Sequence, residues 1–519
     1  MTDAGPAPMD MLSVHAAARP DKVALIEDVP GAPARSWTFA ELEEWSARVA
    51  GALAGLGVAP GDRVVWCGPN SPTVVALTHG CRKAGVTAVP LNYRLTPDEA
   101  GYVLDNCDAT VAFVDAEFAA LVTEAAPAAP RLARLLSYGG PAAGCEDADV
   151  VFAAAVPVPT SAPAALVMIY TSGTTGRPKG AVRQTSGDPQ QVGAMLTLIG
   201  YTPDDVYLTT GPLYHSGPGG FAAIAHSLGN TVVVQRKFDP EDWLRLVTTY
   251  RVSTTFSAPT PIRMVCALPP EVRDRYDTSS MRRMIANAAP WSLALKQAYL
   301  AVFPSDSLWE VYGSTELGVD TIMPPADHLR KPGSCGLPAP GIEIKLLDDE
   351  GGEVTEPGVP GELFVRSASM FSAYHKAEDK YEEDRRGDFH TVGDIAYRDE
   401  DGFIYICDRK KDMIISGGMN VYPAEIEAAL EHHPDIYEVA VFGIPSEEWG
   451  EMVHAVVVPR PGAALTAGDV AAFARDHLAG YKVPRSVSFL GELPRTGSGK
   501  ILKRQLREPF WAGRTSRVS

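Results

Sequence analysis

Eleven residues, Tyr170–Gly180, combine three glycines, four Ser/Thr hydroxyls and one lysine in the order YTSGTTGRPKG. Glycine lets backbone N–H groups turn toward an anion at close range, and Ser and Thr hydroxyls add neutral donors. Lys179 adds a positive charge, so the stretch predicts a cradle for a polyphosphate. It differs from Gly-x4-Gly-Lys-Ser/Thr, the P-loop of the NTPases. A polar surface turn is the ordinary interpretation of a Gly/Ser/Thr cluster, but the particular order favours phosphate binding.

This order resembles the phosphate loop of the adenylate-forming superfamily, which includes acyl-CoA synthetases, peptide-synthetase adenylation domains and luciferases. Further matching stretches follow in the family's order, so the resemblance covers nearly the whole chain. In these enzymes a carboxylate attacks the α-phosphate of ATP, and the acyl-AMP then passes its acyl group to a thiol. The first step needs alignment and charge neutralisation rather than a general base, because a carboxylate is ionised at pH 7. By this resemblance, the β- and γ-phosphates contact Thr171, Ser172, Gly173, Thr174, Thr175, Gly176 and Lys179.

A second matching stretch, Tyr312-Gly313-Ser314-Thr315-Glu316, resembles the part of the family site around adenine and the α-phosphate. The resemblance implies that Tyr312 stacks on adenine, that Thr315 donates to the α-phosphate and that Glu316 holds Mg²⁺. It also places Gly313 and Ser314 beside the nucleotide. One glutamate suits Mg²⁺, since this ion keeps several waters and binds phosphates together with one or two carboxylates. The alternative is a strand-end turn with a capping threonine, but spacing and order favour the binding site.

Three more positions complete the expected nucleotide site. In the family, small residues opposite the tyrosine make room for a purine, and the matching stretch here is Ala288, Ala289 and Pro290. Asp394, preceded by Gly393, resembles the aspartate that accepts both ribose hydroxyls, although Val392 stands where the family commonly has threonine. Arg409 is the second expected ribose contact. An isolated aspartate or arginine is more often solvated or salt-bridged, so both assignments rest on the surrounding motifs.

The resemblance also identifies groups near the reacting carboxylate. The stretch Arg495-Thr-Gly-Ser-Gly-Lys500 is a loop that presents one lysine, and in the family this lysine reaches the carboxylate and the α-phosphate during adenylation. His215 matches a His or aromatic position that lines the acyl pocket. The bulky Trp291 is expected near the same pocket.

Around these motifs, strand and helix patterns alternate. Residues 1–115 predict a mostly parallel sheet covered on both faces by helices. Residues 116–163 are rich in Ala and Pro and are expected to form a connector with a weakly held helix. The alternation resumes after the phosphate loop, and Gly211–Gly220 is expected to be a loop around His215. From Gly333, short strands between Gly/Pro turns predict a small β-rich subdomain.

The predicted fold class is α/β, with two unequal domains. Residues 1–410 form a large N-terminal domain that binds ATP and the acyl group, built of two α/β sheet subdomains and the β-rich subdomain. Residues 411–519 form a small, mobile α+β C-terminal domain. Lys411 matches the interdomain hinge of the family. The pantetheine arm is expected to approach Gly417 and Gly418, for which helix capping is the alternative.

Composition excludes several classes of function. The 519 residues carry 46 basic and 64 acidic side chains, a net charge of −18 that disfavours nucleic acids and anionic membranes as partners. Seven scattered cysteines form no C-x-x-C pair, so neither a disulfide framework nor a zinc site is indicated. The N-terminus lacks a signal-peptide core, and no apolar run reaches membrane-spanning length. We therefore expect a cytoplasmic protein.

Together these motifs predict an acyl-CoA synthetase that forms AMP, with ATP, Mg²⁺ and coenzyme A as its cofactor and co-substrates. The expected acid is medium-chain, branched or aryl, since the loop around His215 and the bulk of Trp291 suggest a medium-sized apolar pocket. An acyl-AMP ligase that loads the phosphopantetheine of a carrier protein is an alternative. A non-catalytic nucleotide-binding protein is another, which the presence of every expected charged residue disfavours. The sequence allows a homodimer.

Overall fold

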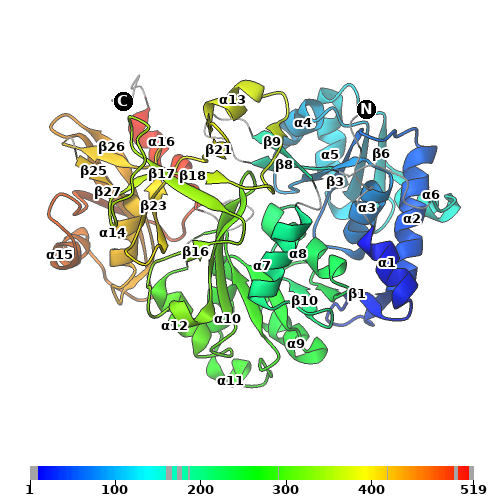
Figure 1. The fold of residues 1–519 in the computed structure, drawn as a ribbon, viewed down its shortest axis with the longest axis horizontal. Coiled ribbons are helices and arrows are strands. Elements are labelled where there is room, and N and C mark those ends of the chain that lie inside the picture. The colour runs from blue at the N-terminus through cyan, green and yellow to red at the C-terminus, as the bar shows by residue number, and fades with distance from the viewer. Residues whose placement is uncertain are drawn as a thin grey trace.

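The computed structural model describes residues 10–158, 166–171, 178–184, 188–289, 291–417, 419–495 and 501–512. Four sheets organise these residues (Figure 1), with eight, nine, six and five strands. The first three belong to the chain before residue 410 and the last follows residue 413. This arrangement confirms the predicted α/β fold class, with a large domain of several sheets and a small C-terminal domain. The boundary at residues 410 and 411 stays a prediction.

The eight-stranded sheet has the order β19-β9-β8-β4-β3-β5-β6-β7, and its inner strands are parallel. Its strands are β3 Arg63–Cys67, β4 Thr87–Leu91, β5 Val111–Asp115, β6 Arg134–Tyr138, β7 Glu146–Asp147, β8 Leu166–Thr171, β9 Lys179–Gln184 and β19 Ala373–Tyr374. The helices of this part are α1 Met11–Ala18, α2 Phe39–Gly55, α3 Pro72–Lys83, α4 Pro97–Asn106, α5 Ala119–Ala125 and α6 Ala148–Ala154. The sequence Thr38-Phe-Ala-Glu41 has the Ser/Thr-x-x-Glu pattern that predicts a capping box, and this box begins α2.

The expectation that residues 116–163 form only a connector with a weakly held helix is wrong. Strands β6 and β7 and helices α5 and α6 lie within this stretch. Strand β6 pairs in parallel with β5 and therefore extends the sheet. Helix α5 buries mainly small side chains, Ala119, Val122 and Ala125, against the sheet. A helix that packs through alanine has no periodic large apolar residues, so the usual helical signal is weak here.

The nine-stranded sheet has the order β16-β15-β14-β13-β12-β10-β11-β1-β2. Its strands are β1 Val23–Glu27, β2 Arg35–Thr38, β10 Val206–Thr209, β11 Thr231–Val234, β12 Thr254–Ser257, β13 Arg283–Ala286, β14 Leu308–Ser314, β15 Gly318–Met323 and β16 Leu337–Pro338. Its helices are α7 Pro189–Ile199, α8 Ser216–Ser227, α9 Pro240–Tyr250, α10 Pro259–Cys266, α11 Pro270–Arg273 and α12 Leu293–Leu300. Adjacent residues of β10, Tyr207 and Leu208, enter different hydrophobic cores, so the sheet is buried on both faces.

Helix α8 corrects a second expectation, since it begins inside the predicted loop Gly211–Gly220. His215 is the residue before its first turn and Ser216 is its first residue. Pro218 lies in that first turn, where a missing N–H costs no helical hydrogen bond. The glycines there suggested a longer loop than the structure has. The helix therefore starts directly beside the motif residue His215.

The β-rich subdomain and the C-terminal domain have separate sheets. The six-stranded sheet contains β17 Glu343–Leu347, β18 Gly361–Arg366, β20 Arg385–Arg386, β21 Phe389–His390, β22 Asp394–Arg398 and β23 Ile404–Arg409, and helix α13 Glu378–Glu383 lies nearby. The five-stranded sheet contains β24 Ile414–Ser416, β25 Met419–Val421, β26 Ile436–Ser446, β27 Gly450–Pro459 and β28 Ser486–Phe489. Helices α14 Pro423–Leu430, α15 Ala467–His477 and α16 Lys503–Trp511 complete this domain. One hydrophobic core there has all its buried members between Ile414 and Val483.

Charged side chains join the C-terminal domain to the rest of the chain. Arg263 Nη1 of α10 lies 2.9 Å from Glu438 Oε1 of β26. The same carboxylate accepts from Arg495, the last described residue before position 501. Nearby, Ser292 hydrogen-bonds Glu431, whose pKa is raised by burial. The two acids of the C-terminal domain thus face one arginine of α10.

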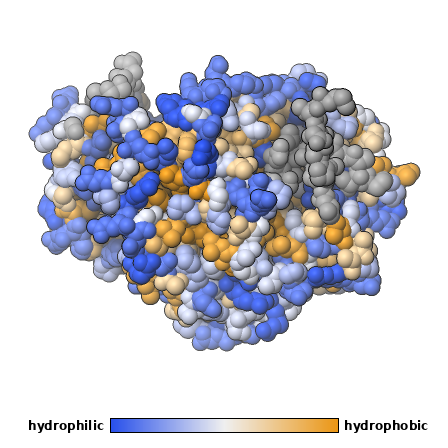
Figure 2. Space-filling view, in the orientation of Figure 1, coloured by the Kyte–Doolittle hydropathy of each residue, from blue (hydrophilic) through white to orange (hydrophobic). Residues whose placement is uncertain are grey.

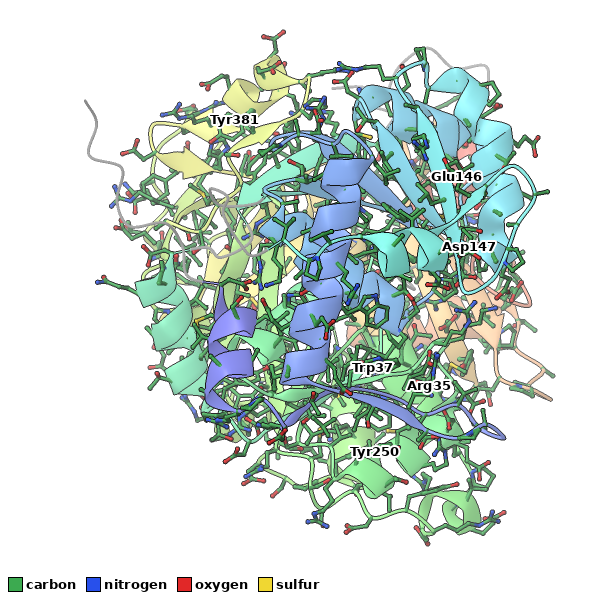
Figure 3. The ribbon with its side chains drawn as sticks, turned by 90° about the vertical axis from the view of Figure 1, so that its right-hand side faces the viewer. Arg35, Trp37, Glu146, Asp147, Tyr250 and Tyr381 are labelled. Carbon is green, nitrogen blue, oxygen red and sulfur yellow. The ribbon has the colours of Figure 1, made fainter. Side chains whose placement is uncertain are left out.

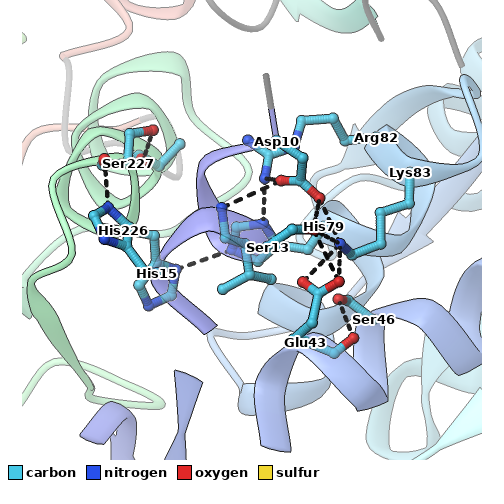
Figure 4. Close-up of polar contacts among 12 residues, drawn as sticks. Asp10, Ser13, His15, Glu43, Ser46, His79, Arg82, Lys83, His226 and Ser227 are labelled. Atoms are coloured by element: carbon cyan, nitrogen blue, oxygen red, sulfur yellow. Dashed lines mark hydrogen bonds and ion pairs between the residues drawn. The ribbon is translucent and has the colours of Figure 1, made fainter. Parts of the chain in front are cut away.

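A buried polar network holds α1, α2, α3 and α8 together (Figure 4). The Lys83 side chain is fully buried, with Nζ 2.5 Å from Asp10 Oδ2 and 2.7 Å from Glu43 Oε2. A buried charge is tolerated when it is paired and hydrogen-bonded in this way. Beside it, His79 Nε2 lies 3.0 Å from His226 Nδ1 of α8. The network therefore fixes the C-terminal end of α8, whose N-terminal end follows His215.

The edge of the nine-stranded sheet is formed by β2, visible with Arg35 and Trp37 near the lower end of α2 in Figure 3. Arg35 pairs with Glu27 and lies 5.4 Å above the Trp37 ring, which packs against Trp45 at 5.6 Å. Charged and bulky side chains on an edge strand discourage pairing with another chain. This edge is thus protected.

Candidate functional site

The predicted nucleotide motif lies where three sheets meet. Tyr312, Gly313 and Ser314 are the last residues of β14, so this strand is longer than the sequence indicated. The chain then turns through Thr315 and Glu316 into β15. A Cβ atom on Gly313 would lie 1.9 Å from the carbonyl oxygen of Gly318, so the tight hairpin requires glycine there. The hairpin thereby fixes the backbone that carries the motif.

Tyr312, Asp394 and Arg409 come together although they are far apart in sequence. The Tyr312 hydroxyl donates to Asp394 Oδ2 at 2.5 Å, and Arg409 Nε lies 3.3 Å from Asp394 Oδ1. Asp394 and Arg409 are direct partners in the pairing of β22 with β23. Burial and then the Asp394 carboxylate raise the pKa of the Tyr312 phenol well above its usual value. Burial opposes the Arg409 charge and is the largest single influence, but Asp394 together with further negative groups nearby outweighs it and raises the pKa of the guanidinium.

Glu316 lies beside the ends of the phosphate loop. Its Oε1 accepts hydrogen bonds from Thr171 Oγ1 at 3.0 Å and from the Tyr374 hydroxyl at 3.1 Å. The residue is 8% exposed, so its carboxylate is largely withdrawn from water. Lys179 is the first residue of β9, and its Nζ lies 5.6 Å from the centre of the Tyr374 ring. Burial, followed by Lys380, lowers the pKa of Lys179. A phosphate between Lys179 and Glu316 would meet one positive charge and one carboxylate.

Thr315 is held by two contacts that the sequence did not indicate. Its Oγ1 lies 2.8 Å from Ser216 Oγ at the start of α8. Arg183 of β9 donates to the Thr315 carbonyl oxygen at 2.9 Å and to the Ser369 carbonyl oxygen at 2.7 Å. The only sequence feature that pointed to Ser216 was its place directly after the motif residue His215, and nothing in the sequence pointed to Arg183. His215 itself is half-buried, with its ring 4.4 Å from that of Tyr214.

The small-residue stretch forms a strained turn. Ala288 has φ of +71°, a conformation that residues with a side chain rarely adopt and that is often kept at functional sites. Asn287 accepts from the Ala288 N–H and donates to the Val311 carbonyl oxygen of β14, which ties the turn to the motif strand. Ala289 is half-buried. The expected wall thus stands next to β14.

Trp291 is buried in the core beneath α12 rather than exposed at a surface. It is 4% exposed, and its ring meets that of Tyr299 edge-on at 6.2 Å. The same hydrophobic core contains Leu295 and Phe303. Trp291 therefore packs as a core residue, and its expected contact with an acyl pocket stays a prediction.

The expected hinge and thiol-side residues lie at the start of the C-terminal domain. Lys411 follows Arg409 in a turn closed by a 2.8 Å hydrogen bond from the Asp412 N–H to the Arg409 carbonyl oxygen. Burial, followed by Arg409, lowers the pKa of Lys411. Gly417 has φ of +59° and donates to the Trp449 carbonyl oxygen at 2.8 Å. A Cβ there would lie 2.8 Å from the Trp449 ring, so this position favours glycine for packing as well as conformation.

Eight of the predicted site residues lie outside the described part of the chain: Ser172, Gly173, Thr174, Thr175, Gly176, Pro290, Gly418 and Lys500. Their roles stay predictions. Among the residues that the structure does describe, no group of three or more His, Cys, Asp or Glu side chains could hold a metal ion. That Glu316 shares Mg²⁺ with phosphate and water, the arrangement this ion favours, stays a prediction.

Figure 2 is drawn in the orientation of Figure 1 and shows the same face of the molecule. Figure 2 shows hydrophobic residues near the centre of this face and a largely hydrophilic rim. Within the described residues, no helix is long and apolar enough to cross a membrane.

Comparison with known proteins agrees with this geometry. A family model described as AMP-binding enzyme matches residues 12–375, and one described as AMP-binding enzyme C-terminal domain matches residues 425–500. A feruloyl-CoA synthase from an Amycolatopsis species is 37% identical over 477 residues, which cover 91% of this chain and 94% of that protein. The fatty acid–[acyl-carrier-protein] ligase ScoC of Streptomyces coeruleorubidus is 35% identical over 498 residues, covering 93% and 94%.

A solved structure is similar over its full length. The o-succinylbenzoate coenzyme A synthetase MenE of Bacillus subtilis, in complex with ATP and magnesium ion, superposes with a TM-score of 0.84 at 28% identity. The match covers 96% of this chain and 100% of that one. The match thus includes both the large sheets and the C-terminal domain.

Proposed function

Because the chain belongs to the AMP-binding enzyme family of adenylate-forming ligases, we propose that it joins a carboxylic acid to coenzyme A with ATP as the energy source. The observation that carries this proposal is the convergence of Tyr312, Asp394 and Arg409 beside Glu316 and Thr171. These side chains supply one aromatic ring, ribose-binding charges and a metal-binding carboxylate from three different sheets. Asp394 and Glu316 are both buried, and both carboxylates favour the charged form of Arg409. Such a group of buried ionisable side chains is frequent at functional sites.

In this proposal, the residues around Asp394 hold the nucleoside. The Tyr312 ring stacks on adenine, with Ala288, Ala289 and Pro290 on the opposite side. Asp394 accepts from the ribose hydroxyls, and Arg409 donates to the ribose while it balances the Asp394 charge. The observed Tyr312–Asp394 hydrogen bond fixes the ring and the carboxylate relative to each other before ATP arrives. Such preorganisation lowers the cost of binding.

The reacting groups lie one turn further along the hairpin. Thr315 donates to the α-phosphate, while Lys179 and the phosphate loop hold the β- and γ-phosphates. Glu316 would hold Mg²⁺ together with the phosphates, and the ion would neutralise charge on the triphosphate. The substrate carboxylate oxygen attacks the α-phosphorus and pyrophosphate leaves, which gives acyl-AMP. Lys500 stabilises the charge that develops in this step, and His215 lines the pocket of the acyl group.

The second half-reaction involves the C-terminal domain. Rotation about Lys411 brings Gly417 and Gly418 to the site, where their backbone borders the pantetheine arm. The thiol sulfur attacks the acyl carbonyl, and AMP leaves with one oxygen of the original carboxylate. The similarity to a feruloyl-CoA synthase supports coenzyme A as the acceptor and an aryl acid among the candidates, beside medium-chain and branched acids.

A second candidate has a specific observation in its favour. The similarity to an acyl-carrier-protein ligase is nearly as high as that to the CoA synthase, at 35% against 37% identity. In this alternative the adenylation step is unchanged, and a carrier-bound phosphopantetheine replaces coenzyme A. Because both acceptors end in the same thiol arm, the contacts of Gly417 do not discriminate between them.

One experiment tests the proposal and its alternative together. The purified protein is incubated with ATP, Mg²⁺ and a panel of aliphatic, branched and aryl acids, and pyrophosphate release is measured for each. The active acid is then offered with coenzyme A or with holo-carrier protein, and the thioester is identified by mass. We expect acid-dependent pyrophosphate release and an acyl-CoA product. Thioester on the carrier alone would establish the alternative, and pyrophosphate release that no acid stimulates would contradict both.

A further inference from the structure

Asp320 of β15 is a buried acid without a partner. The residue is 0% exposed, and neither of its carboxyl oxygens has a hydrogen-bond partner in the described structure. Buried carboxyl groups are normally hydrogen-bonded, because an unmade bond forfeits the hydration that the group had in water. A ligand that forms the missing hydrogen bonds with the Asp320 carboxyl group would explain this exception.

The backbone at Asp320 is a β-bulge. Tyr312 pairs with Thr321 and Gly313 pairs with Val319, so Asp320 has no opposite residue on β14. On the other side of the strand, its carbonyl oxygen accepts from the Ala339 N–H at 2.9 Å. Bulges redirect a side chain locally and are frequent next to active sites. The bulge thus sets the Asp320 side chain apart from the regular pattern, within the hairpin that carries Tyr312 and Thr315.

The charges around Asp320 do not satisfy it. Arg183 is the nearby cation that favours the ionised form of Asp320, but its guanidinium donates to the carbonyl oxygens of Thr315 and Ser369. Among the described residues, no ion pair within 4.0 Å joins Arg183 to Asp320. Burial, followed by the Asp394 charge, raises the pKa of Asp320 well above its usual value. The Asp320 carboxyl group therefore forms a hydrogen bond with neither Arg183 nor Asp394, and both of its oxygens remain available to a ligand.

The position of Asp320 in the hairpin suggests which ligand could form hydrogen bonds with its carboxyl group. In the proposed function, the nucleoside already has Tyr312, Asp394 and Arg409 as partners. The reacting end of the acid must lie at Thr315, and the same arginine that holds the Thr315 carbonyl lies near Asp320. A substrate whose carboxylate is at Thr315 can thus present its body to Asp320. An entirely apolar body would leave the buried carboxyl unsatisfied, whereas a polar group would complete it.

Building on the proposed function, we propose that Asp320 determines specificity by hydrogen-bonding a hydroxyl or amino group on the body of the carboxylic acid. The enzyme then prefers hydroxy or amino acids of this kind to their unsubstituted analogues. A site built to bond a polar substrate group discriminates strongly against the analogue that lacks it, because the protein group is left unpaired. A preference of about 100-fold in kcat/KM or more is the expected size.

The test compares matched acids in the full-length protein. Hydroxycinnamic acids are compared with cinnamic acid, aminobenzoic acids with benzoic acid, and hydroxyhexanoic acids with hexanoic acid, by acid-dependent pyrophosphate release. In at least one pair the substituted acid should be favoured about 100-fold in kcat/KM. Asp320→Leu should cut that ratio to below about 10-fold by raising activity toward the unsubstituted acid, since leucine has a similar volume and needs no partner. Glu343→Gln, which removes an exposed charge on β17, should leave the ratio unchanged.

The outcomes separate the two levels of inference. Acid-dependent activity without a preference for any substituted acid, or an unchanged ratio in Asp320→Leu, would overturn the role of Asp320 alone. Absence of acid-dependent pyrophosphate release in the unmodified protein would overturn the proposed function itself. If Asp320→Leu does not fold, Asp320→Asn provides the comparison, and the substrate pairs on the unmodified protein still decide. A loss of activity equal for both acids of a pair would indicate a structural role and contradict the proposal.

Discussion

Two aspartates near the hairpin differ in what surrounds them, and the difference separates their roles. Asp394 receives a hydrogen bond from Tyr312 and lies against Arg409, so its charge is balanced before any ligand binds. Asp320 has no such partner in the described structure. A balanced carboxylate suits a permanent contact such as ribose, which every turnover requires. An unbalanced one suits a variable substrate group.

The Asp394 role predicts a loss that depends on its charge. Asp394→Asn should lower kcat/KM for ATP in acid-dependent pyrophosphate exchange by about 10- to 100-fold, since hydrogen bonds to a charged group contribute about 1.5–3 kcal/mol. The side chain keeps its shape, so the loss reports the charge. Asp399→Asn is the matched control, because Asp399 directly follows β22 and pairs with Lys331 rather than with a residue of the site. An Asp394→Asn enzyme within twofold of the unmodified one would contradict the ribose assignment.

At this scale the sequence identified the motif residues but not the residues that hold them. Tyr312, Thr315 and Glu316 stand in one short stretch whose order has a recognisable meaning. Arg183 and Tyr374 reach that stretch from other strands, and their contacts exist only because two sheets meet there. A single arginine or tyrosine in a strand carries no local signal of such a meeting. Asp320 was missed for the same reason, since a bulge is a property of pairing.

Helix α8 connects the candidate site with the buried histidine pair. Its first residue, Ser216, contacts Thr315, and His226 near its other end contacts His79 at 3.0 Å. The His226 ring also lies 3.0 Å from the Ala24 carbonyl oxygen with its second nitrogen. Both rings are buried, and burial lowers the pKa of His226 to about 4. The folded helix therefore depends on neutral histidines.

This dependence predicts a stability that falls in mild acid. Below about pH 6.5 the unfolded chain binds a proton at His226, whereas the folded chain binds it only near pH 4. The free energy of unfolding therefore decreases as the pH is lowered from about 6.5 to about 4. From pH 7 to pH 5 the His226 contribution should be a loss of about 2 kcal/mol. His226→Gln should reduce the pH dependence of urea unfolding by this amount. The exposed His432→Gln is the control, and an equal pH dependence in His226→Gln would refute the mechanism.

The sequence predicted elements well where local signals agreed. Thr38 and Glu41 mark the start of α2 through a capping box that forms as expected. Between residues 116 and 163 the sequence indicated one weakly held helix but neither strand β6 nor the second helix, because alanine-rich packing hides the apolar periodicity. The start of α8 was missed because glycine and proline are read as loop residues, although both fit a first turn.

For the whole molecule, the contact between domains centres on one carboxylate. Glu438 faces Arg263 of the first domain and Arg495 of its own domain. Arg495 immediately precedes residues 496–500, the last of which, Lys500, the family resemblance assigns to adenylation. The same acid thus contacts both the large domain and the residue next to this stretch. Because Glu438 is 9% exposed, water screens this pairing little.

This link predicts unequal effects on the two half-reactions. Glu438→Gln should slow acid-dependent pyrophosphate exchange about 10-fold, the smaller effect expected for a charged hydrogen bond, and should leave the transfer of pre-formed acyl-AMP to coenzyme A nearly unchanged. The two steps are measured separately with the same enzyme. Glu425→Gln, which breaks the more exposed pair with Lys482, is the control. Equal losses in both half-reactions would show that Glu438 serves stability rather than the adenylating arrangement.

The central claim is that a carboxylate attacks the α-phosphorus of ATP at the site formed by Tyr312, Thr315, Glu316, Asp394 and Arg409. The most direct measurement uses an acid labelled with oxygen-18 in its carboxylate and follows the label by mass spectrometry after thioester formation. Acyl-AMP formation requires that one labelled oxygen remain on AMP when the thiol displaces it. We predict AMP that carries one labelled oxygen. Unlabelled AMP, or ADP with labelled phosphate, would contradict the account.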